Sequence, residues 1–249
     1  MPAPVWVVLP TYNEALNLER VVHAVRAAVP GVHVLVVDDG SPDGTGAIAD
    51  ALAAAHPGVH VLHRPHKAGL GRAYVAGFAH AIEAGAATVV EMDADFSHDP
   101  ADLPRLLERV ADGADLALGS RYVSGGGIQD WGPLRRGISR LGCGYARRVL
   151  SAPVRDLTGG YKAFRASTLA AIDYPSVRSQ GYAFQVELTH RALQLGLRVD
   201  EVPIVFRERE HGRSKMSGRI ALEAVWLVPA LRWRRWATDS GEVARVPMT

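Results

Sequence analysis

The chain has little of several features that define special classes of protein. It contains one cysteine, Cys143, in 249 residues, so no disulfide can form within the chain and a reducing cytoplasm is the expected compartment. No run of about 18 apolar residues occurs, which predicts that no helix spans a membrane. An apolar strand starts almost at once without a basic leader, so secretion is not expected. The net charge of +2 gives no reason to expect a nucleic-acid partner.

What is present is an ordinary globular composition, with 48% apolar and 22% charged residues. A chain of 249 residues can bury a substantial core. The composition changes towards the C-terminus, where basic residues gather, a tryptophan-containing segment follows and a polar stretch ends the sequence. We therefore expect one large domain over residues 1–218, an amphipathic helix over 219–237 and a disordered tail over 238–249.

Short apolar runs alternate with helical patterns through the first half of the chain. The runs predict buried strands at Val5–Leu9, Val32–Val37, Val59–Leu62 and residues 87–92. The patterns between them predict helices ending near Ala28, following Thr45, and covering residues 72–84 and 103–110. Asn13 is the expected cap of the first helix, and Ser41 or Asp43 that of the second. This alternation predicts an α/β fold, with a mostly parallel, Rossmann-like sheet flanked by helices.

The second half of the chain is less regular. Its patterns predict a strand at Asp115–Leu118, a long helix at Pro133–Leu150, a turn entering a strand within residues 156–165, a helix at Tyr182–Leu195 and a last strand at Val199–Phe206.

Acidic loops follow three of the predicted strands. Asp93 and Asp95 follow the fourth strand, and alternate residues of an extended chain point the same way. Glu14 and Asp39 follow the first and second strands. Because the carboxyl ends of parallel strands share one edge, these loops should form one acidic cleft, where open α/β sheets bind ligands. Taken alone, the aspartate pair is more typical of a solvated acidic loop that caps the helix starting near Pro100. A shared cleft instead suits Mg²⁺ or Mn²⁺ completed by a substrate phosphate.

Basic residues of the second half supply the opposite charge. Arg121, Arg209 and Lys215 are expected to hold phosphates above the acidic cleft, which is the layout of an enzyme that uses a nucleoside diphosphate. Arg135 and Arg136 are typical either of a solvated helix face or of a site for an acceptor phosphate, and the sequence does not separate the two.

Two further patterns leave alternatives open. Gly69-Leu70-Gly71 follows a strand and opens a helix, as in a dinucleotide fingerprint, but Tyr74 stands where that fingerprint needs a small third residue. Residues 220–236 are apolar, with three tryptophans and flanking arginines. This favours an interfacial helix, or a docking face for a membrane partner, over a terminal helix packed on the sheet.

In combination the motifs resemble a known family. They are PTYNE at residues 10–14, DDGSPDGT at 38–45, GLG at 69–71, DAD at 93–95, GSRY at 119–122, DLTG at 156–159, GYAFQ at 181–185 and SK at 214–215. From Val5 to Gly218 the chain is similar to the inverting GT-A glycosyltransferases of family 2, and within them to the polyprenol-phosphate (dolichol-phosphate) mannose synthases. The resemblance implies the GT-A fold, followed here by the C-terminal amphipathic helix.

The resemblance also implies roles for individual residues. Those that match the site for the guanosine part of GDP-mannose are Pro10, Tyr12, Glu14, Val37 and Asp39. Asp93 and Asp95 match the pair that holds Mg²⁺ or Mn²⁺, and Ala94 matches a nucleotide contact. Ser97 stands where some members have a glutamine that reaches the metal. The matching phosphate contacts are Arg121, Arg209 and Lys215, and the acceptor phosphate is expected at Arg121, Arg135, Arg136 and Ser139.

The activity implied is transfer of mannose from GDP-mannose to a polyprenyl (dolichyl) monophosphate with inversion, Asp95 and Arg121 being the catalytic residues. The chain resembles family members without C-terminal spans, which implies peripheral attachment on the cytoplasmic face of a membrane or a separate membrane-anchor protein. Two alternatives stay open: transfer of glucose or another sugar from a UDP-sugar to a polyprenyl phosphate, and an NAD-dependent oxidoreductase built on Gly69 and Gly71.

Overall fold

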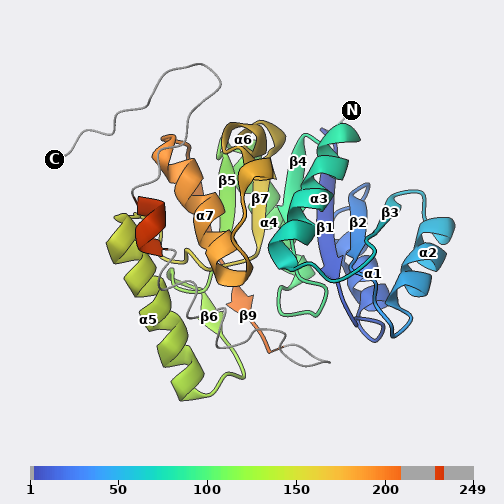
Figure 1. The fold of residues 1–249 in the computed structure, drawn as a ribbon, viewed down its shortest axis with the longest axis horizontal. Helices are drawn as coiled ribbons and strands as arrows, with labels where there is room; N and C mark the ends of the chain where they lie inside the picture. The colour runs from blue at the N-terminus through green and yellow to red at the C-terminus, as the bar shows by residue number, and fades with distance from the viewer. Residues whose placement is uncertain (1–2, 209–227, 233–249) are drawn as a thin grey trace.

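A seven-stranded sheet organises the protein, in the order β3-β2-β1-β4-β7-β5-β8. The computed structural model describes residues 3–208 and 228–232 (Figure 1). The strands of this sheet are β1 (Val5–Thr11), β2 (His33–Asp38), β3 (Val59–His63), β4 (Thr88–Glu91), β5 (Leu116–Ser120), β7 (Lys162–Arg165) and β8 (Val199–Pro203). Neighbours pair in parallel except β7, which runs antiparallel to β4 and β5. A separate pair is formed by β6 (Gly127–Ile128) and β9 (Val205–Phe206).

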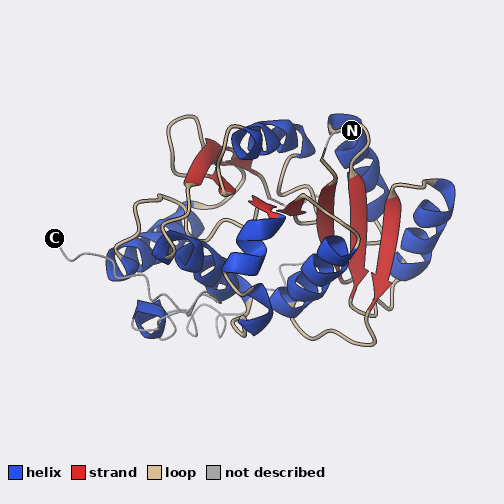
Figure 2. Ribbon diagram, turned by 90° about the horizontal axis from the view of Figure 1, so that it is seen from above, coloured by secondary structure: helices blue, strands red, loops and turns tan. Residues whose placement is uncertain are grey.

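Helices cover both faces of the sheet (Figure 2). They are α1 (Leu18–Ala28), α2 (Thr45–Ala55), α3 (Leu70–Glu83), α4 (Leu103–Ala111), α5 (Pro133–Leu150), α6 (Ala166–Ala171) and α7 (Gly181–Gln194), with 3-10 turns at Pro100–Asp102 and Tyr174–Ser176. On β1, Val7 and Leu9 pack in the layer of α1, α2 and α4, whereas Trp6 and Val8 pack in the layer of α3, α6 and α7. The continuous apolar runs are therefore strands buried on both faces.

The predicted mostly parallel α/β fold is confirmed. The strand predicted at residues 87–92 ends at Glu91, so Asp93 and Asp95 do follow its carboxyl end. The bounds of α5 are those predicted. The last predicted strand is divided at Ile204, because β8 pairs with β5 while β9 pairs with β6.

The sequence did not predict that β7 is inserted antiparallel between two parallel strands, nor the short helix α6. Strand direction depends on where the preceding segment leaves the sheet, and the local pattern of β7 carries no such information. The consequence is that Lys162 of β7 lies beside Glu91 of β4, at the edge of the sheet that bears Asp93.

The first predicted helix cap is wrong. Asn13 has a left-handed φ of 57°, and its backbone amide donates to Ser41 Oγ at 3.0 Å. Consequently α1 begins only at Leu18. The cap predicted for the second helix is also wrong, because Gly44 occupies the N-cap position of α2. Asp43 accepts the amide hydrogen of Thr45 at 3.1 Å, while the hydroxyl of Ser41 donates to Asp38.

The described part of the C-terminal region packs on the domain. Val228 and Leu231 are buried in a cluster with Cys143, Ala146 and Leu150 of α5. Arg232 donates to Ser151 Oγ at 3.0 Å, at the C-terminal end of α5. The rest of the amphipathic helix predicted over 219–237, including its three tryptophans, lies outside the described residues, as does the predicted tail. Within residues 3–208 and 228–232 no helix is long and apolar enough to cross a membrane.

The contact between α3 and β1 gives a test of this packing. A Cβ placed on Gly77 of α3 would lie 2.4 Å from Val8 Cγ1, whereas one on Gly142 of α5 meets nothing within 4 Å. We expect Gly77→Ala to lower the free energy of unfolding by about 1–3 kcal/mol through overpacking. The control Gly142→Ala should raise it by up to about 1 kcal/mol, since alanine favours helix. Urea unfolding measures both, and a Gly77→Ala protein as stable as the parent would contradict the packing described.

Candidate active site

A cavity of about 450 Å³ lies at the carboxyl ends of β1, β2 and β4. Its lining includes Thr11 at the end of β1, Glu14 after it, Asp39 after β2, and residues of the 93–98 loop after β4. The prediction that the three acidic loops meet is therefore confirmed. The volume is in the range of cavities that hold small molecules and cofactors.

The structure brings most of the predicted site residues to this cavity, but not all. Those that line it are Pro10, Tyr12, Glu14, Asp39, Asp93, Ala94, Asp95, Arg121 and Arg135. Val37 is instead fully buried in the core, and Arg136 is exposed outside the cavity lining. The hydroxyl of Ser139, also outside the lining, bonds that of Tyr122 at 2.7 Å. Arg209 and Lys215 lie outside the described residues.

The loop after β4 is held in a tight turn. Asp95 Oδ1 accepts the backbone amide of Ser97 at 3.0 Å, and Phe96 between them has a φ of 60°. A left-handed conformation is costly for an aromatic residue and persists only where the surroundings fix it. The guanidinium of Arg20 lies 4.9 Å from the Phe96 ring and contributes such a contact. Asp95 is buried at the cavity wall as a result.

Asp93 is positioned by two aromatic side chains. The hydroxyl of Tyr74 donates to Asp93 Oδ1 at 3.4 Å, and the backbone amide of Asp93 donates to His98 Nδ1 at 3.1 Å. His98 is buried, and burial lowers its pKa to about 4. Its ring is therefore neutral at pH 7, with Nδ1 accepting and Nε2 carrying the hydrogen. The Asp93 side chain keeps 35% of its surface exposed.

The two aspartates fit a divalent cation whose other ligands come from a substrate. Both line the cavity in a loop with fixed geometry, and carboxylate oxygens suit Mg²⁺ and Mn²⁺. In the part of the chain that the structure describes, no group of three His, Cys, Asp or Glu side chains is arranged to hold a metal. A pair of protein ligands is what Mg²⁺ commonly takes when phosphates and waters complete its shell.

Asp39 is not an isolated carboxylate. Arg64 Nη1 lies 2.5 Å from its Oδ1, and the amide of Ala68 donates to Oδ2 at 3.4 Å. Burial raises the pKa of Asp39 above its ordinary value, and the Arg64 charge opposes that effect. On the same side of the cavity, the ammonium of Lys67 lies 4.4 Å from the ring centre of Tyr12. These contacts join the loops after β1, β2 and β3.

Arg121 is held by a buried ion pair. Its Nε and Nη2 donate to the two carboxylate oxygens of Asp156, each at 2.7 Å, and Nη2 also donates to Thr158 at 2.8 Å. Burial acts to lower the pKa of Arg121, but Asp156 outweighs it and the pKa lies above its ordinary value. Arg121 therefore stays charged beside the cavity, and Asp156 fixes the plane of its guanidinium.

A second buried pair lies behind the cavity. Lys162 Nζ is 4.0 Å from Glu91 Oε2, and both side chains are fully buried. Burial raises the pKa of Glu91 to about 7, and it lowers that of Lys162 to about 8. Lys162 also donates to the backbone carbonyl of Gln185 at 3.0 Å, and Gln185 lines the cavity. The pair thus supports the part of the cavity wall that Gln185 contributes.

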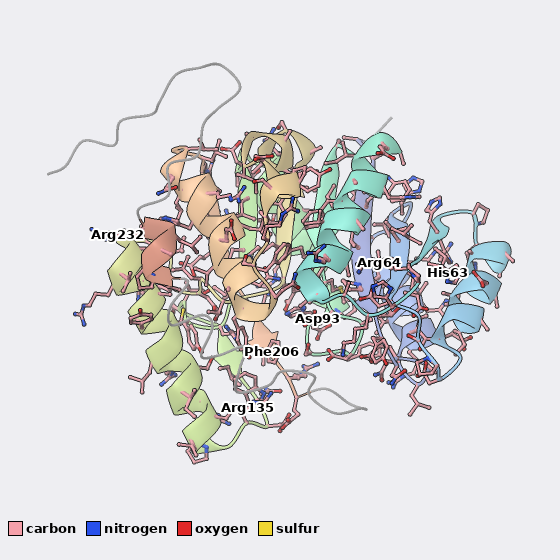
Figure 3. The ribbon with its side chains drawn as sticks, in the orientation of Figure 1. His63, Arg64, Asp93, Arg135, Phe206 and Arg232 are labelled. Carbon is pink, nitrogen blue, oxygen red and sulfur yellow. The ribbon has the colours of Figure 1, made fainter. Side chains whose placement is uncertain are left out.

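Sequence reasoning missed several residues that line the cavity: Lys67, His98, Trp131, Thr158, Gln180, Tyr182, Gln185 and Phe206. Thr158, Tyr182 and Gln185 belong to motifs of the resemblance, which was the signal available for them. Trp131 has no such signal. It contacts Phe206 edge to face at 5.4 Å, and the Arg135 guanidinium lies 3.9 Å from its ring centre, so Arg135 reaches the cavity from the start of α5 (Figure 3).

The glycines of the possible dinucleotide motif serve packing here. A Cβ on Gly71 would lie 2.7 Å from the Ser179 carbonyl oxygen, and the amide of Gly71 donates to Gln180 Oε1 at 3.2 Å. The start of α3 is thus packed on the start of α7, with a side chain already bonded to its amide. This arrangement gives no support to the oxidoreductase alternative.

Comparison with known proteins agrees with this geometry. The model of the family "Glycosyl transferase family 2" matches residues 6–172. The chain is 53% identical over 223 residues to polyprenol monophosphomannose synthase of Mycolicibacterium smegmatis, covering 89% of this chain and 84% of that protein. It is 52% identical over 239 residues to undecaprenyl-phosphate mannosyltransferase of Micrococcus luteus, covering 96% of this chain and 97% of that protein.

Solved structures share the fold at lower identity. Glucosyl-3-phosphoglycerate synthase from Mycobacterium tuberculosis, in complex with Mn²⁺, UDP and glucosyl-3-phosphoglycerate, superposes with a TM-score of 0.68 at 21% identity, over 92% of this chain and 80% of that one. A mannosyltransferase from Pyrobaculum calidifontis, in complex with GDP-Man and Mn²⁺, superposes with a TM-score of 0.62 at 19% identity. The match covers 95% of this chain and 66% of that one. With the family model covering most of the domain and two relatives more than half identical, the chain belongs to glycosyl transferase family 2.

Proposed function

We propose that this chain transfers mannose from GDP-mannose to a polyprenyl monophosphate and so makes a lipid-linked mannosyl donor. The observation that carries the proposal is the placement of Asp93 and Asp95 in the same cavity as the loops after β1 and β2. The names of the two relatives, which share more than half of their residues with this chain, support mannose as the sugar and a polyprenyl phosphate as the acceptor.

The cavity divides the donor between two sets of residues. Tyr12, Glu14 and Asp39 would bind the nucleoside at the β1 and β2 side, with Pro10 and Ala94 against it. Asp93 and Asp95 would hold Mg²⁺ or Mn²⁺ between themselves and the diphosphate. When bound, that cation supplies positive charge to the departing GDP. Arg209 and Lys215, which belong to the predicted phosphate contacts, remain part of this proposal.

The acceptor needs orientation more than activation. A polyprenyl monophosphate is mostly dianionic near neutral pH, since its second pKa is about 6, so it attacks without a strong general base. Arg135 at the cavity mouth would bind this phosphate, and Arg121 would face the reacting groups with its plane fixed by Asp156. Holding the phosphate on the side of the anomeric carbon opposite GDP gives inversion.

Because the acceptor is a lipid, we place the enzyme at the cytoplasmic face of a membrane, attached peripherally or through a separate anchor protein. We keep the division into a catalytic domain over residues 1–218, a membrane-contacting helix over 219–237 and a tail over 238–249 as part of the proposal. Val37, buried in the core, is left out of the donor contacts because no side-chain surface of it reaches the cavity.

Replacing Asp95 tests the site. Asp95→Asn keeps an oxygen that can accept the Ser97 amide, so the turn is retained while the charge is lost. We expect mannose transfer from GDP-mannose to fall by about 10²–10³-fold, the usual cost of removing one electrostatic contact to the transition state. The control Asp50→Asn, at an exposed position paired with His63, should act like the parent. Near-normal turnover by Asp95→Asn would contradict the metal assignment. Faster transfer by the parent from UDP-glucose than from GDP-mannose would contradict the proposed donor.

Two neighbouring arginines test the acceptor site. Arg135 lines the cavity and Arg136 does not. We expect Arg135→Gln to raise the KM for polyprenyl phosphate about tenfold, the loss of one charge-assisted hydrogen bond, with the KM for GDP-mannose unchanged. Arg136→Gln should change neither by more than about twofold, since it removes a solvated charge. Equal effects of the two variants would mean that the arginines act only through the general charge of α5.

A further inference from the structure

Lys162 is a buried charged residue to which the proposed mechanism gives no chemical task. It is the first residue of β7, and its side chain and that of Glu91 are both fully buried. A buried ammonium carries a desolvation cost that a hydrophobic side chain of similar volume would avoid. Its Nζ donates twice to one residue, to the backbone carbonyl oxygen of Gln185 at 3.0 Å and to the side-chain oxygen Oε1 of the same residue. The charge of Lys162 is therefore directed at Gln185.

Lys162 fixes which way the amide group of Gln185 faces. An ammonium group only donates hydrogen bonds, so the atom of the amide that is turned towards Lys162 is the oxygen, Oε1. The amide nitrogen, Nε2, which carries two hydrogens, is consequently turned away from Lys162. The side chain of Gln185 lines the cavity although it is only 4% exposed. The cavity wall thus contains an amide whose orientation is fixed from behind.

Gly160 leaves room in front of that amide nitrogen. A Cβ placed on Gly160 would lie 3.4 Å from Gln185 Nε2 and 3.6 Å from His98 Cε1, which are ordinary contact distances, and all three residues line the cavity. The neighbouring Gly159 differs, because a Cβ there would lie 2.8 Å from the backbone oxygen of Gly119. Packing therefore requires glycine at position 159, whereas at position 160 the absent side chain opens the cavity beside the amide.

The order of the strands places this part of the wall at the sugar end of a bound nucleotide sugar. The strands β2, β1, β4 and β7 are neighbours in that order. In the proposed function the nucleoside lies at the ends of β2 and β1, and the diphosphate lies with its cation at Asp93 and Asp95 after β4. The next strand is β7, whose first residue, Lys162, pairs with Glu91 at the end of β4. A sugar that continues the same direction from the diphosphate meets Gln185.

We propose that Gln185 binds the sugar of the nucleotide-sugar substrate: its Nε2 donates a hydrogen bond to a hydroxyl oxygen of the transferred hexose, and Lys162 is the positioning residue that holds the amide in this orientation. This role rests on the proposed function, which places the nucleotide and the cation. A buried amide that binds a hydroxyl favours a substrate that supplies this group, because the amide is otherwise left without a partner.

Calorimetric titration of the full chain with GDP and with GDP-mannose, both in the presence of Mn²⁺, separates the sugar contact from the nucleotide contacts. We expect Gln185→Met to weaken the binding of GDP-mannose about tenfold, through the loss of one hydrogen bond in a buried site, and to leave the affinity for GDP within about twofold of the parent. Equal losses for GDP and GDP-mannose, or no loss for GDP-mannose, would overturn the proposal.

Gln194→Met is the matched control for this titration. Gln194 is the last residue of the same helix, α7, and lies outside the cavity lining. Its buried Oε1 has no hydrogen-bond partner among the residues that the structure describes, so the substitution removes no such bond to that oxygen. This variant should bind GDP and GDP-mannose like the parent.

Gly160→Ala tests the space without removing any contact. The fold accommodates the added methyl group at ordinary contact distances, so the Tm should not change. We expect GDP-mannose to bind about tenfold more weakly or worse, since the methyl group occupies the place of the sugar, while GDP binds as before. An unchanged affinity for GDP-mannose would overturn the placement of the sugar.

Lys162→Met tests the positioning role. It should reproduce the selective loss of GDP-mannose binding, and the double variant with Gln185→Met should bind no more weakly than Gln185→Met alone, because both changes act through one hydrogen bond. A lowered Tm with both affinities equal to those of the parent would mean that Lys162 serves the fold alone, and would overturn its positioning role. If the parent binds UDP-glucose more tightly than GDP-mannose, the proposed substrate fails, and the comparison of UDP-glucose with UDP then tests Gln185 in the same way.

Discussion

Four carboxylates line one cavity, so their mutual electrostatic repulsion has to be offset by nearby hydrogen-bond donors and positive charges. Much of the structure around the cavity follows from that constraint. Glu14, Asp39, Asp93 and Asp95 come from three strand ends that a parallel sheet brings to one edge. Each is supplied with its own donor: Asn17 for Glu14, Arg64 for Asp39, the Tyr74 hydroxyl for Asp93 and the Ser97 amide for Asp95. The Asp93 side chain stays one-third exposed, so its carboxylate is accessible to a cation in the cavity.

Two arginines with fixed side chains, Arg121 and Arg135, line the same cavity and oppose this negative charge. The Asp156 carboxylate fixes the Arg121 guanidinium through two hydrogen bonds, and the Arg135 guanidinium stacks over the Trp131 ring. Both arginines come from the half of the chain that follows the regular α/β repeat. A donor diphosphate bound with a divalent cation would balance both sets of charges, because the cation would face the carboxylates and the diphosphate oxygens would face the arginines.

Much of this was readable in the sequence, and the reasons are local. Strands buried on both faces appear as continuous apolar runs, and the parallel repeat places Asp93 and Asp39 at the same edge of the sheet without further information. What was not readable depends on distant partners. No pattern near Arg121 in the sequence predicts that two of its nitrogens donate hydrogen bonds to Asp156. The bounds of α5 were predicted, but its inner side is defined by Val228 and Leu231, so the exposure of Leu134 and Leu141 emerged only with the fold.

The central claim is that Asp93 and Asp95 hold the cation that binds the donor diphosphate. Crystals grown with GDP and Mn²⁺, measured at the manganese absorption edge, test it most directly. The account predicts a single strong anomalous peak in the cavity, in contact with both aspartates and with oxygens of the diphosphate, and the guanine beside Asp39. A manganese peak away from either aspartate, or GDP bound in the cavity with no metal between it and the loop after β4, would contradict it.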